Sequence, residues 1–232
     1  MHNYIELDNL CQSFETNEQP VTLFNNINLS VYQGQTYAIT GPSGVGKSSL
    51  LMLMAGLEQG SSGNVWYVEQ TRKRSIEALK PYTGFIFQQF HLLPELTALH
   101  NVALPLKLRG DRHALDKAKL WLEKVNLSHR ANHKPSQLSG GEQQRVAIAR
   151  AIVFKPKFIF ADEPTGNLDQ KNADEIADLL FACCHENDAG LVMVTHSDAL
   201  ASRADHVYSL NERELIAEHK TTDFTAVREA SC

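Results

Sequence analysis

A glycine-rich segment constrains the fold of this chain more than any other feature of its sequence. The segment is Gly41-Pro42-Ser43-Gly44-Val45-Gly46-Lys47-Ser48, which matches the phosphate-binding loop pattern G-x-x-x-x-G-K-S in full. In such a loop the backbone N–H groups wrap the phosphates of a nucleotide. Lys47 would neutralise the β- and γ-phosphate oxygens, and the Ser48 hydroxyl would be a ligand of Mg²⁺. The alternative is a glycine-rich turn that binds nothing.

The segments around this loop favour the nucleotide-binding interpretation, because they alternate between strand and helix patterns. Thr36–Thr40 is a predicted strand. The helix after the loop would end near Gly60 to Gly63, and four apolar side chains would lie on one of its faces, namely Leu50, Leu53, Met54 and Leu57. Phe158–Ala161 and Leu191–Thr195 are continuous apolar runs of the kind buried in a parallel sheet. The chain is therefore predicted to have an α/β fold with a mostly parallel core sheet.

A second segment has the features of an anion-binding helix end. It is Leu138-Ser139-Gly140-Gly141-Glu142-Gln143-Gln144-Arg145, in which Ser139 and Glu142 have the spacing of a capping box. Gly140 and Gly141 leave the first turn without side chains, so its free N–H groups can meet an anion at the positive end of the helix dipole. The phosphate-binding loop already serves one nucleotide, and no second nucleotide is obvious for this helix.

The residues between Gln88 and Leu138 have a helical pattern and form a predicted helical insert. Apolar side chains recur there at helix spacing, namely Leu115, Ala118, Leu122 and Val125, and Asp111 is a plausible cap. Residues 70–83 are polar and end in a Lys-Pro pair, which indicates a short connection.

Three further positions carry side chains that suit nucleotide hydrolysis. Asp162 and Glu163 end a buried strand, where Asp162 would hold Mg²⁺ and Glu163 would polarise the water that attacks the γ-phosphate. Alone, such a pair is more often a loop start or a helix cap. His196 follows another strand and could bond the γ-phosphate, although a lone histidine is usually a surface residue. Gln88 could reach Mg²⁺ or the water, although by itself it is a loop glutamine.

Composition argues against several other classes of protein. The net charge is −5 and Lys and Arg are not gathered in one block, which argues against nucleic acid as a partner. The four cysteines form no CxxC pair, which indicates reduced thiols. No signal peptide is recognisable at the N-terminus, and the longest apolar run, near Leu50–Leu57, is too short to span a bilayer. Any membrane role is therefore expected to come through a partner.

Taken together, these residues resemble the nucleotide-binding subunit of ABC transporters over nearly the whole chain. Leu138–Gln144 looks like the ABC signature, Gln88 matches the Q-loop glutamine and Asn167-Leu168-Asp169 matches the D-loop. His196 matches the switch histidine, and Phe14 lies where the family has the aromatic ring that stacks on adenine. For Phe14 a role as a core aromatic at a strand end remains an alternative.

The resemblance implies a fold and a set of nucleotide contacts. The fold would be a P-loop NTPase with an N-terminal antiparallel β subdomain, in one domain with core 1–87 and 146–218, a helical subdomain near 88–145 and a polar tail 219–232. The catalytic residues would be Glu163, His196 and Gln88. The Mg²⁺ ligands would be Ser48, Gln88 and Asp162. The ATP contacts would be Phe14, Gly41, Pro42, Ser43, Gly44, Val45, Gly46, Lys47, Ser48, Ser49, Ser139, Gly140, Gly141, Glu142 and Asp169.

Longer motifs narrow the resemblance to one branch of the family. The runs Ala161–Asp169, Phe87–Pro94 and Asn101–Leu106 are similar to lipoprotein-releasing, macrolide-export and cell-division ATPases, and His129–His133 looks most like the lipoprotein-releasing one. Such an ATPase would form a head-to-tail homodimer around two ATP and drive export or extraction of a lipoprotein, peptide or drug. It would act on integral permease subunits from the cytoplasm, at the inner face of the plasma membrane, with the helical insert as the dock.

Three departures and two competing functions qualify this interpretation. The stretch from Gly63 to Gly84 is shorter than in other members of the branch, so the structure of the outer antiparallel region is not predicted. The turn Asn211-Glu212-Arg213 lacks the glycine that is common there, and Ser49 replaces a frequent threonine. The first competing function is a non-transport ABC ATPase that acts as a binding switch in DNA repair, translation or cell division, and of these the cell-division relative uses the same branch motifs. An unrelated P-loop kinase would have no use for the signature at 138–145.

Overall fold

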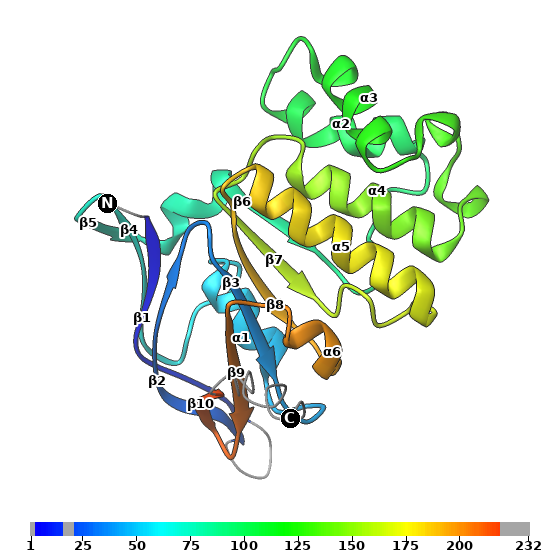
Figure 1. Ribbon diagram of the computed structural model, residues 1–232. Coiled ribbons are helices and arrows are strands. Elements are labelled where there is room, and N and C mark those ends of the chain that lie inside the picture. Colours follow the sequence, from blue (N-terminus) through cyan, green and yellow to red (C-terminus); the bar gives the residue numbers. More distant parts are fainter. Residues whose placement is uncertain (1–2, 16–20, 219–232) are drawn as a thin grey trace, which may run out of the picture.

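The fold is built on a six-stranded sheet whose inner strands run parallel (Figure 1). The computed structural model describes residues 3–15 and 21–218, so the predicted polar tail 219–232 lies outside the described residues. Among the described strands of this sheet, only the edge strand β10 pairs antiparallel, with β9. The order across the sheet is β10 (Glu214–Glu218), β9 (His206–Asn211), β3 (Thr36–Thr40), β8 (Gly190–Val194), β7 (Phe158–Asp162) and β6 (Thr83–Ile86).

A second, antiparallel sheet contains the N-terminal strands, in the order β2 (Val21–Tyr32), β1 (Tyr4–Phe14), β4 (Ser62–Glu69) and β5 (Arg72–Ser75). The prediction of a short connection over 70–83 is wrong, because β5 pairs with β4 and a 3-10 helix, Ile76–Tyr82, follows it. All four residues of β5 are exposed and three are basic, so the strand shows no apolar alternation. The shortened region therefore keeps its outer strand.

The helices cover the parallel sheet on both faces. Their bounds are α1 (Lys47–Met54), α2 (Ala98–Leu108), α3 (Ala114–Lys124), α4 (Gly140–Ile152), α5 (Gln170–Glu186) and α6 (Asp198–Ala201). Alternation along β7 explains the layers: Phe158 and Phe160 face the core that holds α1 and the antiparallel sheet, whereas Ile159 and Ala161 face the core with α4 and α5. Helices α2 and α3 pack on α4 at the far side from the antiparallel sheet (Figure 1).

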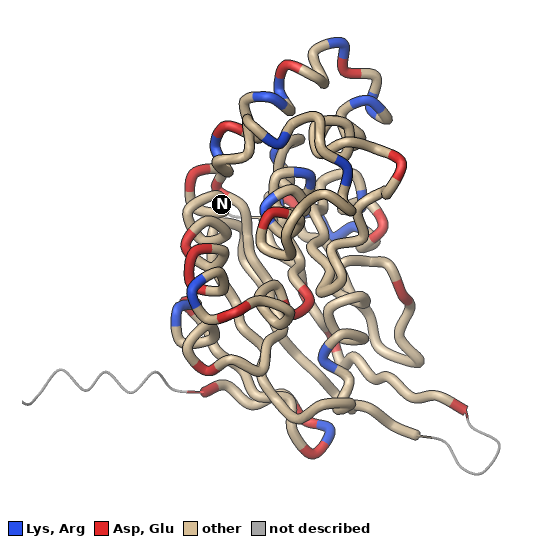
Figure 2. Tube along the Cα trace, turned by 90° about the vertical axis from the view of Figure 1, so that its right-hand side faces the viewer, with Lys and Arg blue, Asp and Glu red and all other residues tan. Residues whose placement is uncertain are grey.

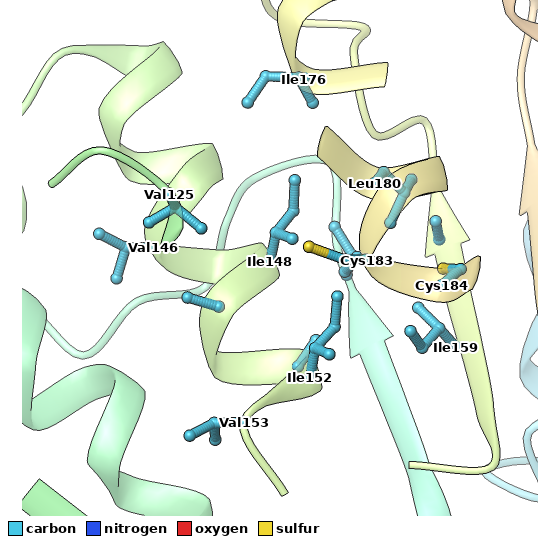
Figure 3. Packing of buried hydrophobic residues seen from close by; sticks show 14 of the residues in the cluster. Val125, Val146, Ile148, Ile152, Val153, Ile159, Ile176, Leu180, Cys183 and Cys184 are labelled. Carbon is cyan, nitrogen blue, oxygen red and sulfur yellow. The ribbon is translucent and has the colours of Figure 1, made fainter. Parts of the chain in front are cut away.

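Buried cysteines belong to the core between α4, α5 and β7. Figure 3 shows Cys183 beside Ile148 and Ile152, and Cys184 beside Ile159. Burial raises the pKa of Cys183 to about 11 and raises that of Cys184 further, so both groups are protonated thiols at neutral pH. They act as small apolar groups. The described cysteines Cys11, Cys183 and Cys184 are free, and Cys232 lies outside the described residues.

Two local predictions about helix ends are wrong. Helix α1 ends before Gly56, which has φ 69°. The Leu57 N–H donates to Met52 O at 2.9 Å in a Schellman motif, and the Leu57 side chain is 52% exposed rather than on the buried face. Asp111 does not cap α3, whose N-cap is His113. The Oδ1 atom of Asp111 instead accepts from the backbone N–H of His113 at 2.8 Å, and this bond orders the turn before the helix.

Candidate functional site

The phosphate-binding loop connects β3 to α1, and its backbone requires glycine at two positions. Gly41 has φ 138°, and a Cβ there would lie 2.3 Å from Leu210 O of the neighbouring strand β9. Gly46, the N-cap of α1, has φ 107°. A side chain at either position would be strained, so the motif glycines are dictated by the turn itself. The loop thus presents its N–H groups at the carboxyl end of the parallel sheet, where such folds bind ligands.

Lys47 lies inside this loop and is only 6% exposed. Its Nζ donates to Gly41 O at 2.8 Å and to Pro42 O at 2.9 Å. Burial lowers the pKa of Lys47, although the nearby carboxylates of Glu163 and Asp162 oppose the shift. The loop therefore holds a buried cation, and two carbonyl groups of the loop itself contact it.

Ser48 and Asp162 come from α1 and β7 and meet beside the loop. The Ser48 hydroxyl donates to Asp162 Oδ1 at 3.0 Å. A hydroxyl and a carboxylate oxygen at this separation form a hard-oxygen donor set, which fits the preference of Mg²⁺ for oxygen ligands. The two predicted metal ligands are thus adjacent although they lie 114 residues apart in the chain.

Glu163 occupies a bend directly after β7, with φ 47°. Its N–H donates to Val194 O at 3.0 Å, which attaches the bend to β8. Burial raises the pKa of the carboxyl group, and the neighbouring His196 and Lys47 partly oppose that shift. A carboxylate with a raised pKa beside a cavity suits a general base, because its proton affinity is higher than that of an exposed glutamate.

His196 approaches the same carboxylate from the open side. The ring atom His196 Nε2 lies 3.1 Å from Glu163 Oε1, and the backbone N–H of His196 donates to Glu163 Oε2 at 3.3 Å. The Oε1 atom is buried and receives no hydrogen bond of good geometry, so the 3.1 Å contact is a close approach rather than a formed bond. The histidine side chain is 51% exposed, whereas that of Glu163 is 13% exposed.

A cavity of about 490 Å³ brings the predicted catalytic residues together. Gln88, Glu163 and His196 line it, with Ser43 of the phosphate-binding loop. Gln88 is exposed, and its backbone carbonyl oxygen accepts from Asn167 Nδ2 at 2.9 Å, so the loop after β6 is bonded to the loop after β7. The lining residues include none from 138–145.

The segment at 138–145 forms the predicted helix start, the N-terminus of α4. Ser139 Oγ accepts from the Glu142 N–H at 3.3 Å, and Glu142 Oε2 accepts from the Ser139 N–H at 2.8 Å, so the capping box is confirmed. Burial opposes the charge on Glu142, but hydrogen bonds from Ser139 and Arg130 lower its pKa. A Cβ on Gly141 would lie 3.1 Å from Asn172 Oδ1, so this glycine lets α4 approach α5 closely.

Two predicted ATP contacts, Asp169 and Phe14, lie outside the phosphate-binding loop and the signature segment. Asp169 caps α5, because its carboxylate accepts from the N–H of Asn172 at 3.1 Å and also bonds the Asn172 side chain. These bonds lower the pKa of Asp169. Phe14 ends β1 and is 46% exposed, which leaves its ring open for a stacking partner rather than packed in the core. Both roles toward ATP stay predictions.

Sequence reasoning missed two polar residues that hold the loop after Gln88. Asn101 is fully buried, and its side chain bonds the backbone of the loop at Leu93, Leu96 and Thr97. Arg150 donates to the carbonyl groups of Phe90 and His91 at 2.8 and 2.6 Å. The available signal was a polar side chain in an otherwise apolar stretch of a helix, such as Asn101 beside Val102 and Ala103.

This arrangement suits hydrolysis of a nucleoside triphosphate. A loop of N–H groups with a buried lysine binds phosphates, a hydroxyl and a carboxylate fit a divalent cation, and a carboxylate of raised pKa lies where water has access. None of the described helices is long and apolar enough to cross a membrane.

Comparisons with known proteins agree with this chemistry. A family model described as ABC transporter matches residues 24–166. The uncharacterized ABC transporter ATP-binding protein YbbA of Escherichia coli strain K12 is 45% identical over 223 residues, 93% of this chain and 98% of the relative. The lipoprotein-releasing system ATP-binding protein LolD of Coxiella burnetii is 41% identical over 222 residues, 92% of this chain and 95% of the relative.

Solved structures give the same result. A dimeric post-hydrolysis state of the ATP-binding cassette MJ0796, bound to ADP and Pi, is similar with a TM-score of 0.82 at 35% identity. The similarity covers 92% of this chain and 97% of that one. A second dimeric structure of MJ0796, described as a bacterial ABC transporter cassette, has a TM-score of 0.80 at 36% identity.

Proposed function

Because this chain belongs to the ABC transporter family and is an ATP-binding ATPase, we propose that it is the motor subunit of a transporter with a separate membrane permease. The membership confirms the resemblance inferred from the motifs, and the similarity to solved cassettes confirms the ABC ATPase fold. The relatives described above are named as transporter components, which favours this function over a cell-division switch.

The proposed chemistry assigns roles to residues of the phosphate-binding loop, to Asp162 and to three residues that line the cavity, Gln88, Glu163 and His196. Lys47 and the loop N–H groups bind and orient the phosphates, and Glu163 accepts a proton from the attacking water. His196 and Gln88 contact the γ-phosphate and the water from either side. Ser48, Asp162 and Gln88 would hold Mg²⁺, which when bound neutralises charge on the phosphate oxygens. The close contacts of Lys47, Ser48 and Glu163 support these roles.

A homodimer with shared nucleotides would explain the second anion-binding helix end. The capped N-terminus of α4 has exposed Ser139 at its tip, yet no residue of 138–145 lines the cavity of its own chain. We infer that this end contacts the ATP held by the partner's loop, as expected for the signature. The dimeric form of the MJ0796 cassettes supports that arrangement.

The helical layer α2–α3 is the proposed dock for the permease. Residues 98–137 carry eight Lys or Arg against three Asp or Glu, a net charge of +5 in a chain whose total is −5. Figure 2 shows the basic residues concentrated in this upper part of the molecule. Leu108 is 79% exposed and Leu120 is 61% exposed among them. A basic surface with exposed leucines fits a protein interface next to a membrane with anionic lipids.

Lipoproteins are the favoured class of cargo, because the LolD relative is named for lipoprotein release and the branch motifs agree. The motor would then lie in the cytoplasm, held at the inner face of the plasma membrane by its permease.

Purification from membranes tests the proposal most directly. The tagged chain, extracted in detergent, is expected to retain an integral membrane protein that mass spectrometry identifies. Leu108→Asp is expected to lower the recovery about tenfold, as for removal of an interface hot spot. Ile216→Asp is the matched control, because Ile216 is an apolar residue on β10 that is 53% exposed, and it should leave the recovery of the membrane protein unchanged. Recovery without a membrane protein, or equal recovery for both variants, would contradict a permease docked on α2–α3.

A further inference from the structure

Gln144 is a buried amide on α4 at the end of the signature segment, and it is not among the predicted ATP contacts. It is 1% exposed and lies one and two turns before Ile148 and Ile152, on the face of α4 that packs into the core. An apolar residue would be expected at this position. A polar side chain that is fully withdrawn from water is destabilising unless it is hydrogen-bonded, so its single partner is informative.

That partner is the backbone of the catalytic bend. Gln144 Nε2 donates to Pro164 O at 2.8 Å, and Gln144 Oε1 is buried without a donor among the described residues. The reversed amide would place oxygen against oxygen, so the bond fixes the orientation of the side chain. Because one half of the amide stays unsatisfied, this residue is a poor choice for stability alone.

Pro164 directly follows Glu163, whose backbone has a left-handed conformation. The Glu163 N–H bonds Val194 O at 3.0 Å, and Glu163 O accepts from the Gly166 N–H at 3.1 Å. The bend is thus attached to β8 on one side, and Gln144 attaches it to α4 on the other. A displacement of α4 relative to the sheet would act on the peptide next to the proposed base, Glu163.

We propose that Gln144 is a positioning residue that couples the N-terminus of α4 to Glu163 of the same chain. The inference rests on the proposed function, in which Ser139 contacts the partner's ATP and Glu163 acts on ATP in its own loop. Gln144 lies five residues after Ser139, about 7.5 Å along a rigid helix. The bond therefore links the two nucleotide sites of the dimer: engagement of one site sets the position of the base in the other.

Gln144→Met tests the coupling, because methionine has a similar length and removes both the donor and the unsatisfied acceptor. The variant is expected to fold with little change in thermal stability, because the lost bond to Pro164 O and the removal of the unsatisfied Oε1 have opposite effects, and to have an unchanged KM for ATP. Its kcat is expected to fall about tenfold, the rate equivalent of one neutral hydrogen bond. Gln12→Met is the matched control, since Gln12 is also buried and bonds the backbone of Ser61, away from the bend.

Gln144→Glu supplies a readout that a purely structural role would not change. An ionised carboxylate cannot donate to Pro164 O, whereas the protonated acid can, and burial favours the protonated form at lower pH. The kcat of this variant relative to the unmodified protein is therefore expected to rise as the pH falls. A ratio that does not change with pH, or a Gln144→Met variant with normal kcat, would overturn the proposal.

Two outcomes separate this inference from the proposed function. If Glu163→Gln abolishes hydrolysis while Gln144→Met has normal kcat, the coupling is wrong and the assignment of the base stands. If Gln144→Met loses ATP binding, stability and kcat together, Gln144 is a structural residue only. If Glu163→Gln hydrolyses ATP normally, the function assigned to the bend is itself wrong.

Discussion

The Nε2 atom of His196 lies 3.1 Å from Oε1 of Glu163, and the His196 N–H donates to the other carboxylate oxygen at 3.3 Å. One residue thus contacts both oxygens of a carboxylate that is mostly withdrawn from water. The histidine covers the exposed side of the Glu163 carboxylate, and the bend after β7 fixes the backbone of Glu163. Glu163 is therefore held at the edge of the cavity with one buried oxygen, Oε1, that receives no hydrogen bond.

Glu163→Gln is expected to lower ATP turnover about 10³-fold, the range for removal of a positioned general base. The amide keeps the shape of the side chain but cannot accept the proton of the attacking water. ATP binding should persist, because the loop and Lys47 are unchanged, and an ATP-bound dimer should accumulate. Steady-state hydrolysis and light scattering of the ATP-saturated protein measure both effects.

The exposed Glu58 provides the control for this substitution, because Glu58→Gln makes the same chemical change outside the cavity. It should hydrolyse ATP at the normal rate and form no trapped dimer. Normal hydrolysis by Glu163→Gln would instead show that another group takes the proton.

The same substitution is expected to stabilise the fold near neutral pH. Burial raises the pKa of Glu163 in the folded chain, so the group lowers stability progressively as the pH rises from the ordinary glutamate pKa to the raised pKa, and the full loss persists above it. Glutamine has no charge to bury. The melting temperature of Glu163→Gln without ATP should exceed that of the unmodified protein at neutral pH, and the difference should vanish below the ordinary glutamate pKa. A difference that grows on acidification would mean that the pKa is lowered instead.

The parts of the site that could be predicted are those whose signal lies in neighbouring residues. Three features are of this kind: the phosphate-binding loop, the capping box at Ser139 and the buried strand before Asp162. Each is a short motif whose flanking residues have the hydrophobic pattern of a helix or a buried strand. Their conformations follow from local sterics and hydrogen bonds, so the structure agrees with the sequence there. The pairing of Ser48 with Asp162 follows as well, because parallel strands present their carboxyl ends at one edge.

The parts that could not be predicted depend on contacts between distant segments. Strand β5 is held by its pairing with β4 and not by an apolar pattern. The hairpin after β9 turns without glycine, with Glu212 at φ 46° and Arg213 at φ 73°. The roles of Asn101 and Gln144 lie in single bonds to backbone groups of other elements, and no periodicity encodes such bonds.

Asn101→Leu is expected to destabilise the protein by about 3 kcal/mol, because it leaves buried backbone groups of the loop at Leu93–Thr97 without partners. That loop connects Gln88 to α2, so its amide hydrogens should also exchange faster. Chemical denaturation and hydrogen exchange measure the two effects. Asn132→Leu, at an exposed position, should stay within about 0.5 kcal/mol. Equal stability of both variants would mean that the loop is held by its other contacts.

Ser139→Phe is expected to abolish ATP hydrolysis while the monomer still binds ATP. The phenylalanine ring would fill the surface at the start of α4, where the partner's γ-phosphate is expected, but it lies outside the cavity of its own chain. Ser139→Ala separates this effect from the loss of the cap, which costs about 1 kcal/mol of stability but adds no bulk. Nucleotide binding by fluorescence and turnover are measured on all three proteins. If Ser139→Phe no longer binds ATP as a monomer, Ser139 belongs to the site of its own chain.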